Sequence, residues 1–428
     1  MSKVTKSRNI DKTPLVITGE NVKKKTLHLY FEERGYSELL SHSQFFREHL
    51  DMLMEVHPEL FPDDMVKNSY DMHDIRYSSR QDLSYRRIRV RGEESRVLTV
   101  LPSFVMPYWT EKTDKAGKAL LLRYTGTSYD TISYVLGGSA VHWERVETHL
   151  GRCNIVQTTL VEPGELPSHY AADEKITFFN GKEASVPMTC AEECVWGIDL
   201  CLTENIEGLQ TGYGAFATEA KTMNADFEPK SVVIDGWPAT RSAWKTLFPT
   251  ATLILCFLHG VLKIGDRAKH LKEQWATIRL MLWDAYKAAD AETFKAKMDL
   301  FKVIATAVVE PFEKKNILEA IQKVWSKKDE YAKGFEFDNS YRTSNQVDRP
   351  MKALDRYLYN TQYFHGNLEN AQLKLRAWAL IHNFKPFCQR TNLIHVSRFH
   401  QLNRVIYHDH WLQNLLIAGK KSAFIHPT

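Results

Sequence analysis

Apolar positions along the chain follow a different period in different parts of the sequence. Between residues 168 and 260 they form short runs rich in Val, Ile and Leu, such as 232–234 and 253–255, which is typical of buried strands. The amphipathic stretch between these two runs indicates a crossover helix that joins parallel strands. Residues 260–335 instead repeat their apolar positions at helical spacing. The pattern predicts an α/β region followed by a block of long amphipathic helices.

The α/β region has a definite order of expected elements. In chain order these are strands at 168–177, 184–190 and 194–201, a helix over 208–223, a strand that ends at Asp235, a helix, and a strand that ends at Cys256. Asn180-Gly181 predicts a hairpin turn between the first two strands. Three antiparallel strands, a helix, a parallel strand, a helix and another strand form the first two-thirds of a ribonuclease-H-like fold. The fold class expected is therefore an α/β, ribonuclease-H-like mixed sheet.

This fold still lacks its closing helix where the helical block begins, so we interpret the block as an all-α insertion. The closing helix is expected to begin near Thr343, and a further amphipathic helix follows over 366–384.

Residues 117–152 have the spacing of a helix-turn-helix unit. Gly137-Gly138 forms a sharp turn, and Ser128 and Ser139 are expected to cap the helices on either side of it. The third helix would bury Trp143, Val146 and Leu150, and its outward residues are His142, Arg145 and His149. Such residues reach base edges or phosphates in a DNA complex. A small helical bundle that binds nothing is the alternative.

Residues 76–96 form a basic stretch with interleaved tyrosines. Its candidate DNA contacts are Arg86, Arg87, Arg89 and Arg91. Guanidinium groups there would neutralise phosphate charge, and a solvated basic face is the alternative. The net charge of the whole chain is only +4, so basic residues must be judged locally.

These assignments divide the chain of 428 residues into successive parts. They are a mixed N-terminal region considered for DNA contact (1–110), a helix-turn-helix domain (111–155), the first part of the catalytic domain (165–260), the helical insertion (261–338), the last part of the catalytic domain (339–388) and a C-terminal tail (389–428).

The composition is typical of a globular protein and gives no sign of a membrane span, a secretion signal or a disulfide framework. The chain is 43% hydrophobic and 25% charged, as ordinary globular proteins are. No apolar run is long enough to span a membrane, and the N-terminus lacks the apolar core of a secretion signal. The six cysteines show no paired framework, which suits a reducing compartment.

Three carboxylates stand at topologically related places: Asp173 on the first strand, Asp235 at the end of the fourth, and Asp348 on the closing helix. Ligands in open α/β sheets collect at the carboxyl ends of strands. Carboxylates brought together repel one another unless a cation lies among them, and hard oxygen ligands suit Mg²⁺ or Mn²⁺. Two such ions would clamp the attacking and leaving oxygens of a phosphoryl displacement.

Each acid has an alternative explanation or a rival. Asp199 is a rival first acid, and Glu336, Asp338 and Asp355 are fallback third acids. Asp235 could instead cap a helix. Asp348, at the start of a helix, could simply stabilise the positive end of the helix dipole.

Four short motifs in this order resemble a known family. They are Ala172-Asp173-Glu-Lys, Val232-Val-Ile-Asp235-Gly-Trp, Cys256-Phe-Leu-His259 and Thr343-Ser-Asn345-Gln-Val-Asp348-Arg. Over residues 165–385 the chain resembles DDE-type transposases, and is similar to the Mutator-like and hAT groups and their bacterial insertion-sequence relatives. The family usually has Glu where Asp348 stands here.

The resemblance implies a transposase that binds the ends of a mobile element, cuts DNA and transfers strands with two Mg²⁺ (or Mn²⁺) ions held by Asp173, Asp235 and Asp348. Cys256, His259, Trp237, Asn345 and Arg349 would support this site. Flanking cations that would hold phosphates are Lys263, Arg267, Lys269, Arg349, Lys352 and Arg356.

The partners implied are double-stranded DNA, both the terminal repeats and the target, and further copies of the chain in a homodimer or larger assembly, with no membrane. The location would be the cytoplasm, at the nucleoid, in a bacterium and the nucleus in a eukaryote. Two alternatives remain: an inactivated, domesticated transposase that only binds DNA, and a nuclease on the same fold that hydrolyses without joining.

Overall fold

The structure, a computed structural model, describes residues 26–92, 95–106, 111–162, 166–387 and 396–419. Within these residues the protein is mixed α/β, with two mixed sheets and four hydrophobic cores. None of the helices in this part of the chain combines the length and apolar character needed to cross a membrane.

The first sheet belongs to the N-terminal region. Its elements are β1 (Thr26–Leu29), α1 (Tyr36–Ser41), α2 (Ser43–Val56), α3 (Asp63–Asn68), β2 (Tyr70–Ser78), β3 (Leu83–Val90) and β4 (Arg96–Pro102). The strand order is β1-β4-β3-β2. The apolar positions from Leu27 to about Glu59 suggest helices in the sequence, but Leu27 lies in β1, where it pairs in parallel with Val100. A partner so distant in sequence leaves no local signal, so this prediction was wrong.

The second sheet is central and has the order β7-β6-β5-β8-β9. The strands are β5 (His169–Phe179), β6 (Lys182–Ala191), β7 (Cys194–Ile198), β8 (Ser231–Ile234) and β9 (Thr252–Leu255). Strands β5, β6 and β7 are antiparallel, whereas β8 and β9 run parallel to β5. The predicted hairpin turn is confirmed, since Asn180 and Gly181 both have positive φ angles.

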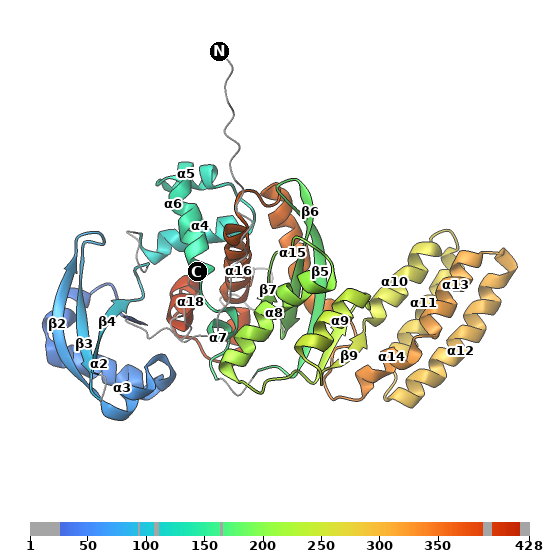
Figure 1. Cartoon of the computed structure of the whole chain (residues 1–428), viewed down its shortest axis with the longest axis horizontal. Coiled ribbons are helices and arrows are strands. Elements are labelled where there is room, and N and C mark those ends of the chain that lie inside the picture. The colour runs from blue at the N-terminus through green and yellow to red at the C-terminus, as the bar shows by residue number, and fades with distance from the viewer. Residues whose placement is uncertain (1–25, 93–94, 107–110, 163–165, 388–395, 420–428) are drawn as a thin grey trace, which may run out of the picture.

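Helices cover both faces of the central sheet (Figure 1). α8 (Ile206–Met223) and α9 (Pro238–Leu247) pack on one face, with Tyr170 and Val232 of the strands in their core. α15 (Asn345–Asn360) and α16 (Leu368–Phe384) pack on the other, with Ala171 and Val233 in their core. Consecutive residues of a strand therefore face different cores, as strand geometry requires.

The helix-turn-helix prediction corresponds to α4 (Thr113–Tyr124), α5 (Tyr129–Leu136) and α6 (Ala140–Leu150). Ser128 and Ser139 cap α5 and α6, each accepting a backbone N–H three residues ahead. Trp143, Val146 and Leu150 are buried as expected. They lie in the same core as α15, α16 and the C-terminal α18 (Trp411–Gly419), so these helices pack on the rest of the molecule. The remaining short helices here are α7 (Ile155–Thr159) and α17 (Arg398–Asn403).

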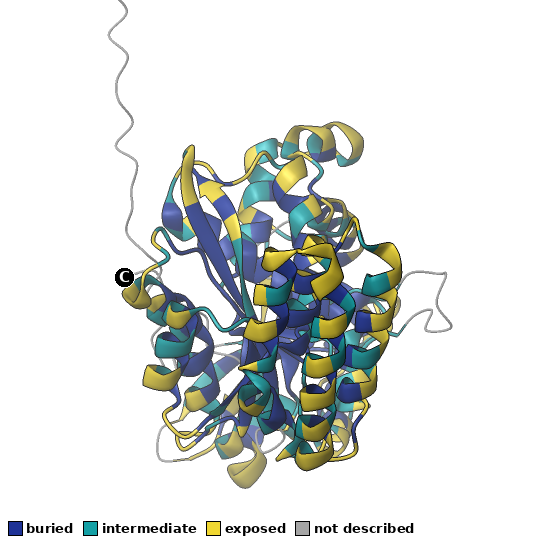
Figure 2. Ribbon diagram, turned by 90° about the vertical axis from the view of Figure 1, so that its right-hand side faces the viewer, coloured by how far each residue is buried: buried dark blue, intermediate teal, exposed yellow. Residues whose placement is uncertain are grey.

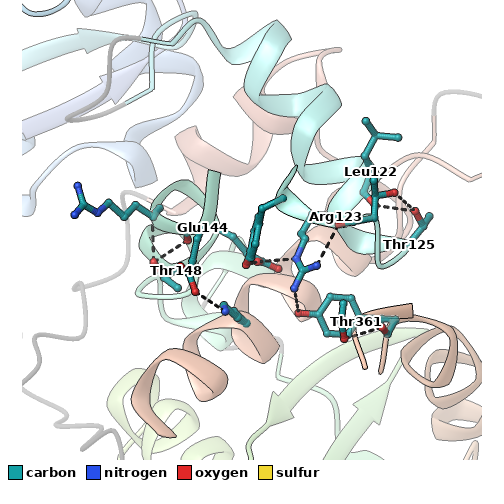
Figure 3. A network of polar contacts seen from close by, with 12 residues as sticks. Leu122, Arg123, Thr125, Glu144, Thr148 and Thr361 are labelled. Carbon is teal, nitrogen blue, oxygen red and sulfur yellow. Dashed lines mark hydrogen bonds and ion pairs between the residues drawn. The ribbon is translucent and has the colours of Figure 1, made fainter. Parts of the chain in front are cut away.

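A buried ionic network joins the helix-turn-helix unit to α15. The Arg123 guanidinium donates to Glu147 at 3.1 Å and to the Tyr357 hydroxyl at 3.4 Å (Figure 3). The Tyr129 hydroxyl also donates to Glu147. Since Tyr357 lies on α15, the network connects the helices of the predicted DNA-binding unit to the helix that carries Asp348.

The expected helical insertion consists of α10 (Phe257–Arg267), α11 (Lys272–Tyr286), α12 (Ala291–Val309), α13 (Lys315–Trp325) and α14 (Lys328–Ala332). These helices project beyond the edge of the sheet formed by β9 (Figure 1). Their inner faces form a core of their own, and their outer faces are exposed (Figure 2).

Candidate active site

Asp173 and Asp235 lie side by side on the central sheet. Strands β5 and β8 are parallel, with Ala171 opposite Val233. Each aspartate lies two residues further along, so both side chains extend from the same face as Ala171 and Val233. That face packs against α15.

Asp348 lies in the first turn of α15. The Ser344 hydroxyl donates to both of its carboxylate oxygens, at 3.2 and 3.1 Å. The Ser344 backbone N–H in turn donates to the Cys256 thiol sulfur at 3.2 Å. The end of β9 and the start of α15 are thereby tied together beside the two strand aspartates.

The three aspartates interact electrostatically. Burial raises the pKa of Asp173 to about 6. The negative charges of Asp235 and Asp348 act in the same direction, which places both within interaction range of Asp173. The Glu174 backbone N–H donates a hydrogen bond of 2.9 Å to the Asp173 carboxylate, and this bond opposes the rise in pKa.

Cys256 and His259 interact with each other next to these acids. Interaction with the Cys256 thiol raises the pKa of His259 to about 9. Burial alone would raise the pKa of Cys256, but the His259 charge and the bond to Ser344 outweigh it, so the pKa of the thiol is lowered. The imidazolium also lies near Asp173 and Asp235. A cationic group therefore stands at the edge of the acidic cluster.

Glu174 is a site carboxylate that the sequence argument did not single out. Burial raises its pKa to about 7, although bonds from the hydroxyls of Thr240 and Tyr213 oppose the shift. It faces α8 and α9, the opposite side from Asp173. Its only sequence signal was its place directly after Asp173 in a strand.

The rival acids lie elsewhere or are already paired. Asp199 is buried and accepts bonds from the Leu200 N–H and the Gln372 amide. Asp355 forms an ion pair with Lys175 at 2.7 Å. The charges that act on Asp173 are those of His259, Asp235 and Asp348, and neither Glu336 nor Asp338 is among them.

Two of the supporting residues have specific positions. The Trp237 backbone N–H donates to Asp235 at 2.7 Å, so Asp235 also organises the turn into α9. Arg349 is largely exposed and forms an ion pair with Glu193 at 2.7 Å. Asn345 and Arg349 line a cavity of about 250 Å³, which also contains His382 and Arg398.

On α6 the three predicted DNA contacts differ in exposure. Arg145 is exposed. His142 is half-buried, 3.6 Å from Glu111, and burial lowers its pKa. His149 is also only partly exposed. The prediction that all three face outward holds for Arg145 and was wrong for the two histidines, because α6 packs between α5 and α16.

The arginines of the basic stretch are mostly neutralised by neighbouring groups. Arg86 is buried and donates to the Leu40 carbonyl, so the prediction that it contacts DNA was wrong. The side chains of Arg87 and Arg91 each form a bidentate ion pair, with Asp74 and Asp71 respectively. Arg89 is exposed on β3. These acids lie across the sheet on β2, so linear spacing does not reveal them.

The donor set fits a hard divalent cation by chemistry but not by its present geometry. Carboxylate oxygens are the ligands that Mg²⁺ and Mn²⁺ prefer. A cation would offset both the burial of the Asp173 charge, which is the main cause of its raised pKa, and the smaller repulsion from Asp235 and Asp348. In the described residues, however, no three His, Cys, Asp or Glu side chains come close enough together to hold one ion. Asp348, held by Ser344, would have to approach the other two.

Comparison with known proteins adds no identification: no model of a protein family matches the chain, and no curated protein sequence matches it.

Proposed function

We propose that this protein is a DDE-class DNA transposase, which binds the ends of a mobile element and cuts and rejoins DNA. The observation that carries the proposal is the alignment of Asp173 and Asp235 on neighbouring parallel strands, with Asp348 near enough to raise the pKa of Asp173. Buried carboxylates with raised pKa values cluster at functional sites.

The order of strands supports a ribonuclease-H-like core. Numbered within the central sheet, the strands stand in the order third, second, first, fourth, fifth, and the first three are antiparallel. This is the arrangement in which the first and fourth strands are neighbours and each presents an acid to the same edge. The helical insertion follows the fifth strand, before α15.

Asp173, Asp235 and Asp348 would hold Mg²⁺ or Mn²⁺, which when bound stabilises the attacking and leaving oxygens at phosphorus. Above pH about 6 the Asp173 carboxylate is ionised and able to bind a cation. The His259 imidazolium keeps its proton at neutral pH and would attract a phosphate oxygen. In cleavage, water would attack phosphorus and release a DNA 3′-hydroxyl; in joining, that hydroxyl would attack a target phosphodiester.

A cleavage assay with Asp235→Asn tests this proposal. The substrate is DNA from the two flanks of the gene, where terminal inverted repeats would lie, incubated with Mg²⁺ and the full chain. We expect Asp235→Asn to lower the cleavage rate by at least about 100-fold, because it removes a charged ligand from the phosphoryl-transfer site. Products are measured as nicked and joined strands on a denaturing gel.

Asp355→Asn is the matched control, since it removes an aspartate that already pairs with Lys175. It should cut at the wild-type rate. Equal cutting by wild type and Asp235→Asn would make the catalytic assignment wrong.

A catalytically inactive DNA-binding protein is the second candidate. The absence, among the described residues, of three groups close enough to hold one ion favours it. The aspartate in place of the family's usual glutamate points the same way, because its side chain is one methylene shorter. The two candidates separate in one measurement: the inactive protein would bind the flanking DNA equally with and without Mg²⁺ and would not cut it.

A further inference from the structure

A basic cavity opens beside the candidate active site, between α10 and α13 of the insertion. Its volume is about 190 Å³. Asp235 and His259 line it at the sheet end, and Lys263, Arg267, Lys323 and Lys327 line it along the helices. We call these four cations and the space between them the α10–α13 groove.

The positive charges of the groove outnumber its acids, since Asp235 is the one carboxylate among the described residues that line it. Within the described residues no ion pair joins any of its four cations to a carboxylate, whereas nearby Lys269 pairs with Asp266 and Lys328 with Asp299. Arg267 donates to the backbone carbonyl of Asn316, which leaves its charge uncompensated. Four positive charges therefore face one narrow space. Such a concentration favours an anionic ligand with several charges.

The two cations of α10 share one face of that helix. Lys263 and Arg267 are four residues apart on α10. Four residues span about 6 Å along a helix and return to the same face. The α10 side of the groove thus carries two cations at an interval comparable to the separation of neighbouring phosphates in an extended nucleic-acid strand. On the other side, Lys323 lies on α13 and Lys327 in the turn that follows it.

We propose that the α10–α13 groove binds the phosphodiester backbone of a single DNA strand that runs between the candidate active site and the insertion. The inference rests on the proposed function, because the strand is taken to be the one whose phosphate reaches Asp235. A groove of about 190 Å³ is too small for a duplex to enter. A positively charged groove that follows the backbone is the usual way in which proteins hold single strands without sequence preference.

The sequence had suggested several flanking cations for phosphate contact. In the structure, some of them line the groove and others are held in ion pairs. Lys263 and Arg267 line the groove, but Lys269 and Arg349 are held in ion pairs with Asp266 and Glu193. Lys323 and Lys327 were not foreseen, because α13 is separated from α10 by the two helices α11 and α12 and contacts it only through tertiary packing.

The test uses the full chain and the double variant Lys263→Gln/Lys323→Gln. The matched control is Arg279→Gln/Lys287→Gln, which removes the same charge from exposed positions of the insertion outside the groove. Binding of a fluorescein-labelled oligodeoxythymidine is followed by fluorescence anisotropy over a range of salt concentrations. A metal chelator is present, so that no cleavage occurs. Thermal unfolding by circular dichroism confirms that the variants are folded.

We expect the groove variant to bind roughly tenfold more weakly than wild type at about 0.1 M salt. Its slope of log affinity against log salt should be shallower by about 1.4, since each phosphate contact on a single strand contributes about 0.7. The control should match wild type in both respects.

Three results would overturn the groove assignment: no binding of the probe by wild type, no change in the groove variant, or an equal loss in both variants. The proposed catalytic function fails separately, through the Asp235→Asn cleavage assay. A wild-type chain that does not cut DNA, but whose binding depends on Lys263 and Lys323, would leave the groove assignment intact.

Discussion

Asp173 shows how burial and neighbouring charge act on one side chain. Its carboxyl lies on a central strand, where water is largely excluded, and two further aspartates lie within interaction range. The ionised form is therefore disfavoured in the folded protein. An ionised carboxylate in such a place lowers the stability of the folded protein, and a cation bound at the proposed site would offset this loss.

The raised pKa of Asp173 gives a stability prediction with a definite sign. Its ordinary value is 3.8 and its folded value about 6, so the folded state binds the proton more tightly and stability falls as the pH rises through this window. Asp173→Asn removes the charge, and should stabilise the metal-free protein by up to about 3 kcal/mol above pH 6. The gain should shrink as the pH falls toward 4.

The measurement is the thermal unfolding midpoint of wild type and Asp173→Asn at pH 5 and pH 8 without divalent cations, where a rise of a few degrees at the higher pH is expected. Added Mg²⁺ should stabilise wild type and not the variant. Asp355→Asn is the control and should show no gain at either pH. A variant less stable than wild type at pH 8 would contradict this account of Asp173.

At the scale of single helices and strands, the elements with local signals were predicted and those with distant partners were not. Ser128 and Ser139 cap their helices, and Asn180-Gly181 turns the hairpin, because each contact lies within a few residues. The strand β1 was missed because it forms only by pairing with β4. A helical period also cannot tell which outer positions a later helix will cover.

In the candidate site, too, some features could be predicted from the sequence and others depend on tertiary packing. The positions of Asp173 within the first strand and of Asp235 directly after the fourth follow from the order of elements, so the sequence predicted that the two lie near each other. The bond from the Ser344 backbone N–H to Cys256, the contact of Tyr213 with Glu174, and the ion pairs of Arg87 with Asp74 and of Arg91 with Asp71 all join residues from different elements. Their positions depend on how the elements pack together. The period of apolar residues along the chain carries no information about that packing.

The buried pair between α4 and α6 gives a prediction at this scale. Arg123 and Glu147 are almost fully buried, and their side chains form an ion pair at 3.1 Å. Glu147→Gln leaves the Arg123 charge buried without a counter-charge, and should destabilise the protein by about 3–5 kcal/mol. The double variant Arg123→Met/Glu147→Leu removes both charges and should recover most of this loss.

Both variants are compared by thermal unfolding, with Asp114→Asn as control. That change breaks the exposed Lys118–Asp114 pair and should cost less than about 1 kcal/mol. If Glu147→Gln unfolds at the same temperature as the control, the network does not hold α4, α6 and α15 together in the way proposed.

At the scale of the whole molecule, the cores define which parts are autonomous. The N-terminal region has a separate core, with Phe46, Leu50 and Ile88 at its centre. The helix-turn-helix unit has none of its own: Trp143, Val146 and Leu150 share a core with Leu375 and Trp378 of α16. Any movement of α6 on DNA would therefore act directly on α16.

Isolated fragments test this division. We expect residues 26–106 to fold alone, because a four-stranded sheet and its helices bury a common core. Residues 111–155 should not fold alone, because their apolar side chains lose α16 and α18 as partners. The measurement is a two-dimensional amide NMR spectrum of each fragment. Dispersed signals from 26–106 and collapsed signals from 111–155 are expected.

A third fragment, 111–155 joined by a flexible linker to 366–419, serves as the control. It restores α16 and α18 to the three helices, and should recover signal dispersion if the shared core is what they lack. A fully dispersed spectrum from 111–155 alone would contradict the prediction. It would make the helix-turn-helix unit an independent module, free to engage DNA without displacing α16 and the helix α15 beside it.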